Sequence, residues 1–89
     1  MERPITIGSV VYSRAGRDEG NYFMVLEIVD DSYVLITDGN IRKLASPKKK
    51  KIKHLKNTGD VLTQIAEKAI IGSKIYDAEV FSALRKYNS

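Results

Sequence analysis

The segment Gly8–Asp30 constrains the fold more than any other part of this chain. Two runs of β-branched, aromatic and other apolar residues, Val10–Tyr12 and Phe23–Leu26, flank a polar loop that contains Gly16 and Gly20. Such runs fit a half-buried pleated surface, whereas the backbone groups of so polar a loop need water or a ligand as partners. The segment therefore predicts a strand, an exposed loop hinged by two glycines, and a second strand.

Apolar runs and the alternation of side chains between two faces, with turn residues between them, predict five short antiparallel strands. They are expected at Gly8–Arg14, Tyr22–Val29, Tyr33–Thr37, Ile41–Leu44 and Lys49–Leu55. In the second of these, Met24, Leu26 and Ile28 should share one face. The dipeptide Asp38-Gly39 predicts a type I′ hairpin turn. Five short strands with closely spaced turns are typical of a small barrel.

The periodicity changes after the last predicted strand. Apolar residues recur every three or four positions between Val61 and Ala69, which predicts an amphipathic helix with Asp60 as N-cap and Gly72 after its C-terminal end. A second helix should follow, with Asp77 as its predicted N-cap. Its predicted buried face consists of Val80, Phe81 and Leu84. We expect both helices to pack on the barrel and enlarge its core.

Length and composition limit the possible classes of protein. A chain of 89 residues forms one domain, which we divide into a barrel at residues 6–56 and a helical extension at 57–89. The absence of cysteine excludes disulfides and thiolate metal sites. No apolar run reaches the roughly 20 residues of a transmembrane helix, and the first residues lack the hydrophobic core of a signal peptide. These features predict a cytoplasmic protein.

The positive charge of the chain is concentrated in one short segment. The net charge is +4, yet residues 42–56 carry eight basic side chains and no acidic one. The residues before this segment are net acidic, and those after it are neutral overall. A localised cationic segment predicts an electrostatic contact with a polyanion.

The glycine loop resembles the KOW motif, a short RNA-binding element of many ribosomal and transcription-associated proteins. The resemblance lies in Gly16-Arg17-Asp18-Glu19-Gly20 between a V-V strand and a V-L-E-I-V strand, and it continues through Tyr33–Gly39 into the basic segment ending at Leu55. In this longer form the chain is similar to the fourteen-E type of large-subunit ribosomal protein and its small bacterial relatives. The resemblance covers about the first two-thirds of the chain. It implies a five-stranded SH3-like barrel that binds structured RNA, in particular ribosomal RNA.

The candidate RNA-binding residues combine this loop with the cationic segment. Lysine and arginine neutralise phosphates with little sequence preference, and arginine adds bidentate contacts. The candidates are Arg14, Gly16, Arg17, Gly20, Arg42, Lys43, Lys48, Lys49, Lys50, Lys51, Lys53, His54 and Lys56. The loop would present backbone amides and Arg17. One surface results only if folding brings Arg14 and Arg17 beside the lysine run. Because exposed lysines contribute little stability, alanines at Lys48–Lys51 should leave folding intact.

Several of these residues have a structural interpretation as well. A lysine run can be a solvated face, a nuclear-localisation signal or a lipid-headgroup patch. His54 fits a base contact and a local strand contact equally well. Tyr12, Tyr22 and Tyr33 are possible platforms on which unstacked bases could stack. For these tyrosines a structural role is the better hypothesis, because barrel tyrosines usually bury the ring and expose the hydroxyl.

Two other functions are compatible with the same sequence. SH3-like barrels also bind proteins, so the chain could be an interaction module of the translation or transcription machinery that uses its helices or the Tyr22/Phe23 face. Attachment to an anionic membrane through the lysines is a third hypothesis. We favour RNA, in a ribosome or another ribonucleoprotein, with no membrane partner.

The sequence does not predict an enzyme. It has no cysteine nucleophile, P-loop or HExxH motif, and the lysines around His54 would oppose the imidazolium that a catalytic base must form. The carboxylates lie mostly in predicted turns, where aspartate is common for local hydrogen bonding. We therefore expect no metal, no cofactor and no small-molecule substrate.

Overall fold

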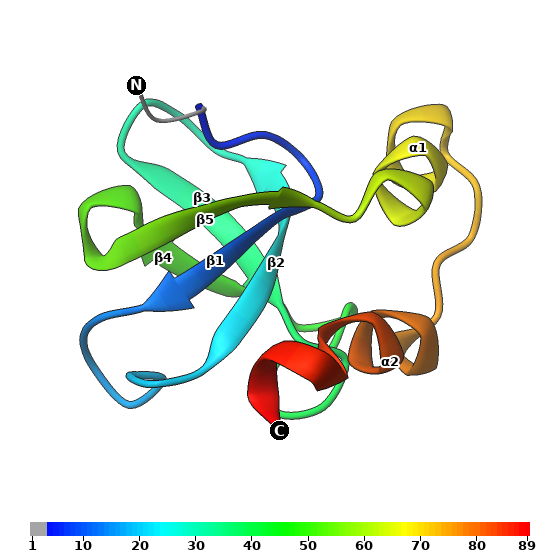
Figure 1. The fold of residues 1–89 in the computed structure, drawn as a ribbon. Helices are drawn as coiled ribbons and strands as arrows, with labels where there is room; N and C mark the ends of the chain where they lie inside the picture. Colours follow the sequence, from blue (N-terminus) through cyan, green and yellow to red (C-terminus); the bar gives the residue numbers. More distant parts are fainter. Residues whose placement is uncertain (1–3) are drawn as a thin grey trace.

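The structure, a computed structural model, describes residues 4–89 and contains a five-stranded antiparallel sheet followed by two helices (Figure 1). Met1, Glu2 and Arg3 lie outside the described residues. The strands are β1 (Ser9–Ser13), β2 (Tyr22–Ile28), β3 (Tyr33–Thr37), β4 (Lys48–Lys51) and β5 (Leu55–Val61). The helices are α1 (Thr63–Ile71) and α2 (Asp77–Asn88).

The sheet is curled, with the two strands at its edges directly connected. The strand order is β4-β3-β2-β1-β5, so β4 and β5 lie at opposite edges. Only a three-residue 3₁₀ turn, Ile52–His54, separates them in the chain. Its first amide, that of Ile52, donates to the carbonyl of Ser32, 2.8 Å away in the turn between β2 and β3. So short a link requires the edges to approach each other at this corner.

The two faces of the sheet form two separate cores. Val11, Phe23, Val25, Val34, Ile36 and Leu55 fill the inner face. On the outer face, Val10 and Met24 pack against Ile65 of α1 and against Val80 and Leu84 of α2. The predicted alternation of side chains between the two faces therefore holds in β1 and in the first half of β2, up to Val25. The helices cover the outer face as expected.

A β-bulge ends this alternation inside β2. The register with β3 shifts between Val25 and Glu27, which leaves Leu26 as the extra residue. Beyond the bulge Ile28 pairs with Val34, a residue of the inner core. The prediction that Ile28 shares one face with Met24 is therefore wrong. The Ile28 side chain is 45% exposed.

The predicted strand Ile41–Leu44 and its type I′ turn are wrong. The Asp38 carboxylate accepts hydrogen bonds from the amides of Asn40 and Arg42, and the Thr37 hydroxyl donates to the Arg42 carbonyl. Side chains thus satisfy backbone groups that a strand would pair. No non-glycine residue among 4–89 has a positive φ, so Asp38 cannot adopt the first central position of a type I′ turn.

The next strands also differ from their predicted bounds. The strand expected at Lys49–Leu55 ends at Lys51, and the chain then turns into β5. Strand β5 continues to Val61, so the sheet extends past the predicted boundary at residue 56. Asp60 consequently lies in β5 instead of capping a helix, and α1 begins at Thr63 without a side-chain cap.

The ends of the helices partly match their predictions. Gly72 follows α1 in the left-handed conformation, with φ +77°, as expected for a residue after a helix C-terminus. Asp77 is the first residue of α2 and not its cap, because its carboxylate accepts a hydrogen bond from the Leu44 amide. Val80 and Leu84 are buried as predicted, but the prediction that Phe81 is buried is wrong, because it is 44% exposed.

No helix within residues 4–89 is long and apolar enough to cross a membrane.

Candidate nucleic-acid interface

The loop between β1 and β2 is closed by its own backbone hydrogen bonds. The amides of Glu19, Gly20 and Asn21 donate to the carbonyls of Gly16, Ser13 and Asp18, respectively. Gly16 and Gly20 have φ values of +79° and +92°, which glycine alone adopts readily. The expectation that this loop presents its amides to a ligand is therefore wrong for these three, and Arg17 remains its exposed cation.

This loop lies directly against the cationic segment. The Arg14 amide donates to the carbonyl of His54 at 2.8 Å, and the Arg14 guanidinium donates to the carbonyl of Lys53 at 3.2 Å. Further along the loop, the ammonium of Lys50 donates to the carbonyl of Ala15 at 2.8 Å. Folding therefore brings the arginine-bearing end of β1 beside the lysine run, which is the arrangement that a single cationic surface requires.

The pleat of β4 sorts its four lysines onto two faces. Lys50 pairs with Val34 and Lys48 with Ile36, both residues of the inner core, whereas Lys49 and Lys51 pair with Leu35 and Tyr33 on the outer face. Lys50 is only 8% exposed. Its aliphatic stem lies on the core side of the strand and its ammonium is held by the loop. Lys50 therefore supports the loop and is not available to a phosphate as the sequence predicted.

Arg42 also has a supporting role. Its Nε and Nη2 atoms donate to the two carboxylate oxygens of Asp18, at 3.3 Å and 3.2 Å. The Asp18 side chain is only 6% exposed and that of Arg42 is 26% exposed. This fork-to-fork pair fixes the loop against the segment that follows β3. Lys43 is exposed on that segment and apart from β4.

Apart from Lys43, the exposed cations among the candidate residues follow the corner of the sheet from β4 to β1. They are Arg14, Lys48, Lys49, Lys51, Lys53 and Lys56, with Arg17 on the adjacent loop. We call these seven residues the cationic strip. Strand β5 places Lys56 opposite Tyr12 of β1, and Lys53 contacts Arg14 through its carbonyl. The strip thus joins both edges of the curled sheet.

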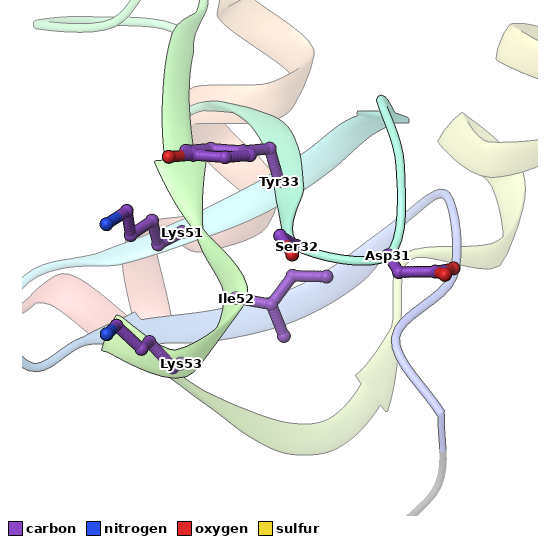
Figure 2. Close-up of a pocket in the computed structure, with 6 residues that line it drawn as sticks. All are labelled: Asp31, Ser32, Tyr33, Lys51, Ile52 and Lys53. Carbon is purple, nitrogen blue, oxygen red and sulfur yellow. The ribbon is translucent and has the colours of Figure 1, made fainter.

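A shallow hollow of about 450 Å³ opens at the middle of the strip (Figure 2). Its lining residues are Asp31, Ser32, Tyr33, Lys51, Ile52 and Lys53. Figure 2 shows the ammonium groups of Lys51 and Lys53 and the Tyr33 hydroxyl projecting to the same side, while the Asp31 carboxylate lies at the opposite end. An anion is therefore attracted to the lysine side of this hollow.

Aromatic rings accompany the strip at both ends. The Lys49 ammonium lies 4.7 Å from the centroid of the Tyr33 ring. At the other end the rings of Tyr12 and Tyr22 are 5.0 Å apart, beside Lys56. His54 is half-buried in the 3₁₀ turn and contributes its carbonyl to Arg14. Sequence reasoning missed the Tyr12–Lys56 juxtaposition, because only the pairing of β1 with β5 reveals it.

Within residues 4–89, no three His, Cys, Asp or Glu side chains cluster closely enough to hold a metal ion. No protein-family model matches this chain.

Proposed function

We propose that this protein is a non-enzymatic, cytoplasmic RNA-binding protein of the KOW type that docks on structured RNA, with ribosomal RNA as the first candidate. One observation carries the proposal: the arginine-bearing end of β1 lies against the only strongly cationic segment of the chain, joined to it by the hydrogen bonds of Arg14 to Lys53 and of Lys50 to Ala15. A surface with concentrated positive charge and few carboxylates is the electrostatic footprint of a nucleic-acid-binding protein.

We further propose that the curled sheet is an SH3-like barrel. Support comes from the strand order, in which each neighbour is antiparallel, and from the three-residue turn that links the edge strands β4 and β5. The inner core, to which β1, β2, β3 and β5 contribute, is consistent with a sheet wrapped around one apolar interior. In this arrangement the strip occupies the corner where β4 turns into β5.

The proposed mechanism separates contact from support. Arg14, Lys49, Lys51 and Lys53 make phosphate contacts along the strip, and Arg17 adds a contact from the loop. Lys50 and Arg42 hold the loop in place through Ala15 and Asp18. This division revises the sequence-based list of contact residues and changes which variants test it.

The first test is the dependence of RNA affinity on salt concentration. If three to five phosphates are neutralised, the logarithm of the association constant should fall with a slope of about −2 to −4 against the logarithm of salt concentration. The double variant K49Q/K51Q should reduce the steepness of this slope by about 1.5 and weaken binding to all RNA sequences alike. Titration of a labelled structured RNA at several salt concentrations measures both effects.

The matched control is K68Q/K74Q, which removes the same charge from α1 and the segment after it. Lys68 pairs with Glu79 at a partly exposed site, and Lys74 is exposed, so neither change should alter folding strongly. An affinity independent of salt, or an equal effect of the control and test variants, would contradict the proposal. Alanine at all of Lys48–Lys51 is unsuitable, because Lys50 is buried and supports the loop.

Crosslinking in cells, followed by sequencing of the attached RNA, identifies the target. We expect ribosomal RNA to be enriched, as the resemblance to fourteen-E type ribosomal proteins implies. Enrichment of a different structured RNA would preserve the RNA-binding proposal and revise its target.

A protein-interaction role has one observation in its favour. Ile41 and Phe81 are 66% and 44% exposed and line a common hollow with Arg85 and Asn21. The Tyr22/Phe23 face that the sequence suggested cannot make this contact through Phe23, because Phe23 is fully buried in the inner core. Partners that remain bound after nuclease treatment, and are lost in F81S, would favour this second function.

A further inference from the structure

We propose that the hollow between Tyr12 and Tyr22 binds one unpaired base of the RNA whose phosphates lie on the cationic strip. This inference rests on the proposed function and specifies its substrate: single-stranded, looped or bulged RNA, not a continuous duplex. The hollow is about 380 Å³ in volume and is lined by Tyr12, Tyr22, Lys56 and Thr58.

The two tyrosines form a preorganised aromatic corner. Tyr12 of β1 and Tyr22 of β2 are direct cross-strand partners, with ring centroids 5.0 Å apart and ring planes inclined by 59°. Both side chains are half-buried. Among residues 4–89, neither the Tyr12 nor the Tyr22 hydroxyl has a hydrogen-bond partner. A hydroxyl hydrogen bond within this part of the chain therefore does not explain why both positions are tyrosine.

The corner is held from behind by the end of α2. The Tyr87 ring lies 5.5 Å from that of Tyr22, and the Tyr87 hydroxyl donates to Asp60 of β5. The Asn88 side chain accepts a hydrogen bond from the Tyr22 amide and donates one to the Tyr22 carbonyl. With the ring and backbone of Tyr22 fixed in this way, binding of a base need not order the site.

Charge makes RNA the occupant that fits this corner. Lys56 of β5 is the cross-strand partner of Tyr12 and lines the same hollow. Arg14 follows Tyr12 by two residues and contacts Lys53 of the strip. A base inserted at Tyr12 therefore has cations beside it for its flanking phosphates. Stacking on an aromatic ring requires only the flat face of a base, which a duplex does not offer.

The test compares two strands of equal charge: a ten-nucleotide oligouridine and the same ribose-phosphate strand without bases. Wild-type protein should bind the oligouridine at least about fivefold more tightly, since one stacked base contributes this much or more. In Y12L the ratio should fall towards one while the salt dependence is unchanged, and in Y12F it should persist. The matched control Y76L changes a different tyrosine, which is 57% exposed, lies outside the strip and has the Lys74 ammonium over its ring, and it should retain the ratio.

The outcomes separate this inference from the function on which it rests. If both strands bind with strong salt dependence and Y12L keeps the wild-type ratio, the base site is wrong and the phosphate-binding strip stands. If the protein binds the structured RNA of the salt titration but neither single strand, the base site alone is wrong. If it binds none of the three, the proposed function fails and the base site with it. Photocrosslinking of wild-type protein to 5-iodouridine RNA needs no variant. It should link Tyr12 or Tyr22, and links confined to Tyr33 or Tyr76 would overturn the inference.

Discussion

Three charged side chains determine how the glycine loop sits on the sheet. Asp18 is 4% exposed and Lys50 8%, which is unusual for these residue types. Each has a specific partner, Arg42 for Asp18 and the Ala15 carbonyl for Lys50, and a charge withdrawn from water needs such a partner. These residues therefore hold the loop beside the cationic strip without belonging to the strip themselves.

The Asp18–Arg42 pair gives a prediction for single substitutions. D18A removes the buried carboxylate and leaves the Arg42 guanidinium without its fork partner, so the free energy of unfolding should fall by about 1–3 kcal/mol. Urea denaturation measures this loss. The neighbouring E19A removes an exposed carboxylate and should change stability by less than about 0.5 kcal/mol. Equal stability of the two variants would show that the pair does not hold the loop.

At the scale of elements, the C-terminal turn of α2 joins two strands that are not sequence neighbours. Asn88 bonds to the backbone of Tyr22 in β2, and the Tyr87 hydroxyl donates to the Asp60 carboxylate in β5 at 2.5 Å. The hydrogen bond to Asp60, followed by burial, raises the pKa of Tyr87 to about 12 from an ordinary value of 10.0. The neutral phenol is the form that the folded protein favours.

This raised pKa predicts a loss of stability at high pH. The stabilisation by Tyr87 is fully present below about pH 10, the ordinary pKa, and is lost as the pH rises towards the folded-state value of about 12. Wild type should therefore be more stable than Y87F by about 1 kcal/mol near neutral pH, and the difference should shrink between about pH 10 and 12. Denaturation of both proteins at several pH values measures it. A constant difference would mean that the Asp60 contact does not stabilise the neutral phenol.

At the scale of the whole molecule, α2 also docks on the segment between β3 and β4. The Leu44 amide donates to the Asp77 carboxylate, and Gly39 lies directly under the first turn of the helix. A Cβ atom at Gly39 would be 2.2 Å from the Asp77 carbonyl oxygen, which is far inside contact distance. This close approach explains why the segment cannot form the predicted strand: it is shaped to receive a helix.

We predict that G39A destabilises the protein by about 1–3 kcal/mol more than G72A, which is a matched control. The two glycines have nearly equal φ values, +74° and +77°, so the backbone strain of alanine is similar at both positions. A Cβ atom at Gly72 meets nothing within 4 Å, and only G39A displaces α2. Thermal unfolding compares them, and equal melting temperatures would argue against tight docking.

The elements that could be predicted from the sequence are those whose patterns are local. Strands β1, β2 and β3 follow from their apolar runs, and α2 from its stripe, because burial on one face imposes a period. Strand β5 is polar and contains Gly59, so only its pairing with β1 reveals it. Tertiary contacts likewise decided the exposure of Phe81, the register after Leu26 and the burial of Lys50. The sequence located the cationic surface correctly but could not separate its supporting residues from its exposed ones.

The position of β4 at the end of the sheet has a further consequence. An edge strand exposes unpaired amide and carbonyl groups that can recruit a strand from another molecule, and lysines on such a strand oppose this pairing. The lysine run therefore opposes self-association through this edge, besides supplying much of the charge of the cationic strip. Variants that lose these charges need a check of their aggregation state before any loss of binding is interpreted.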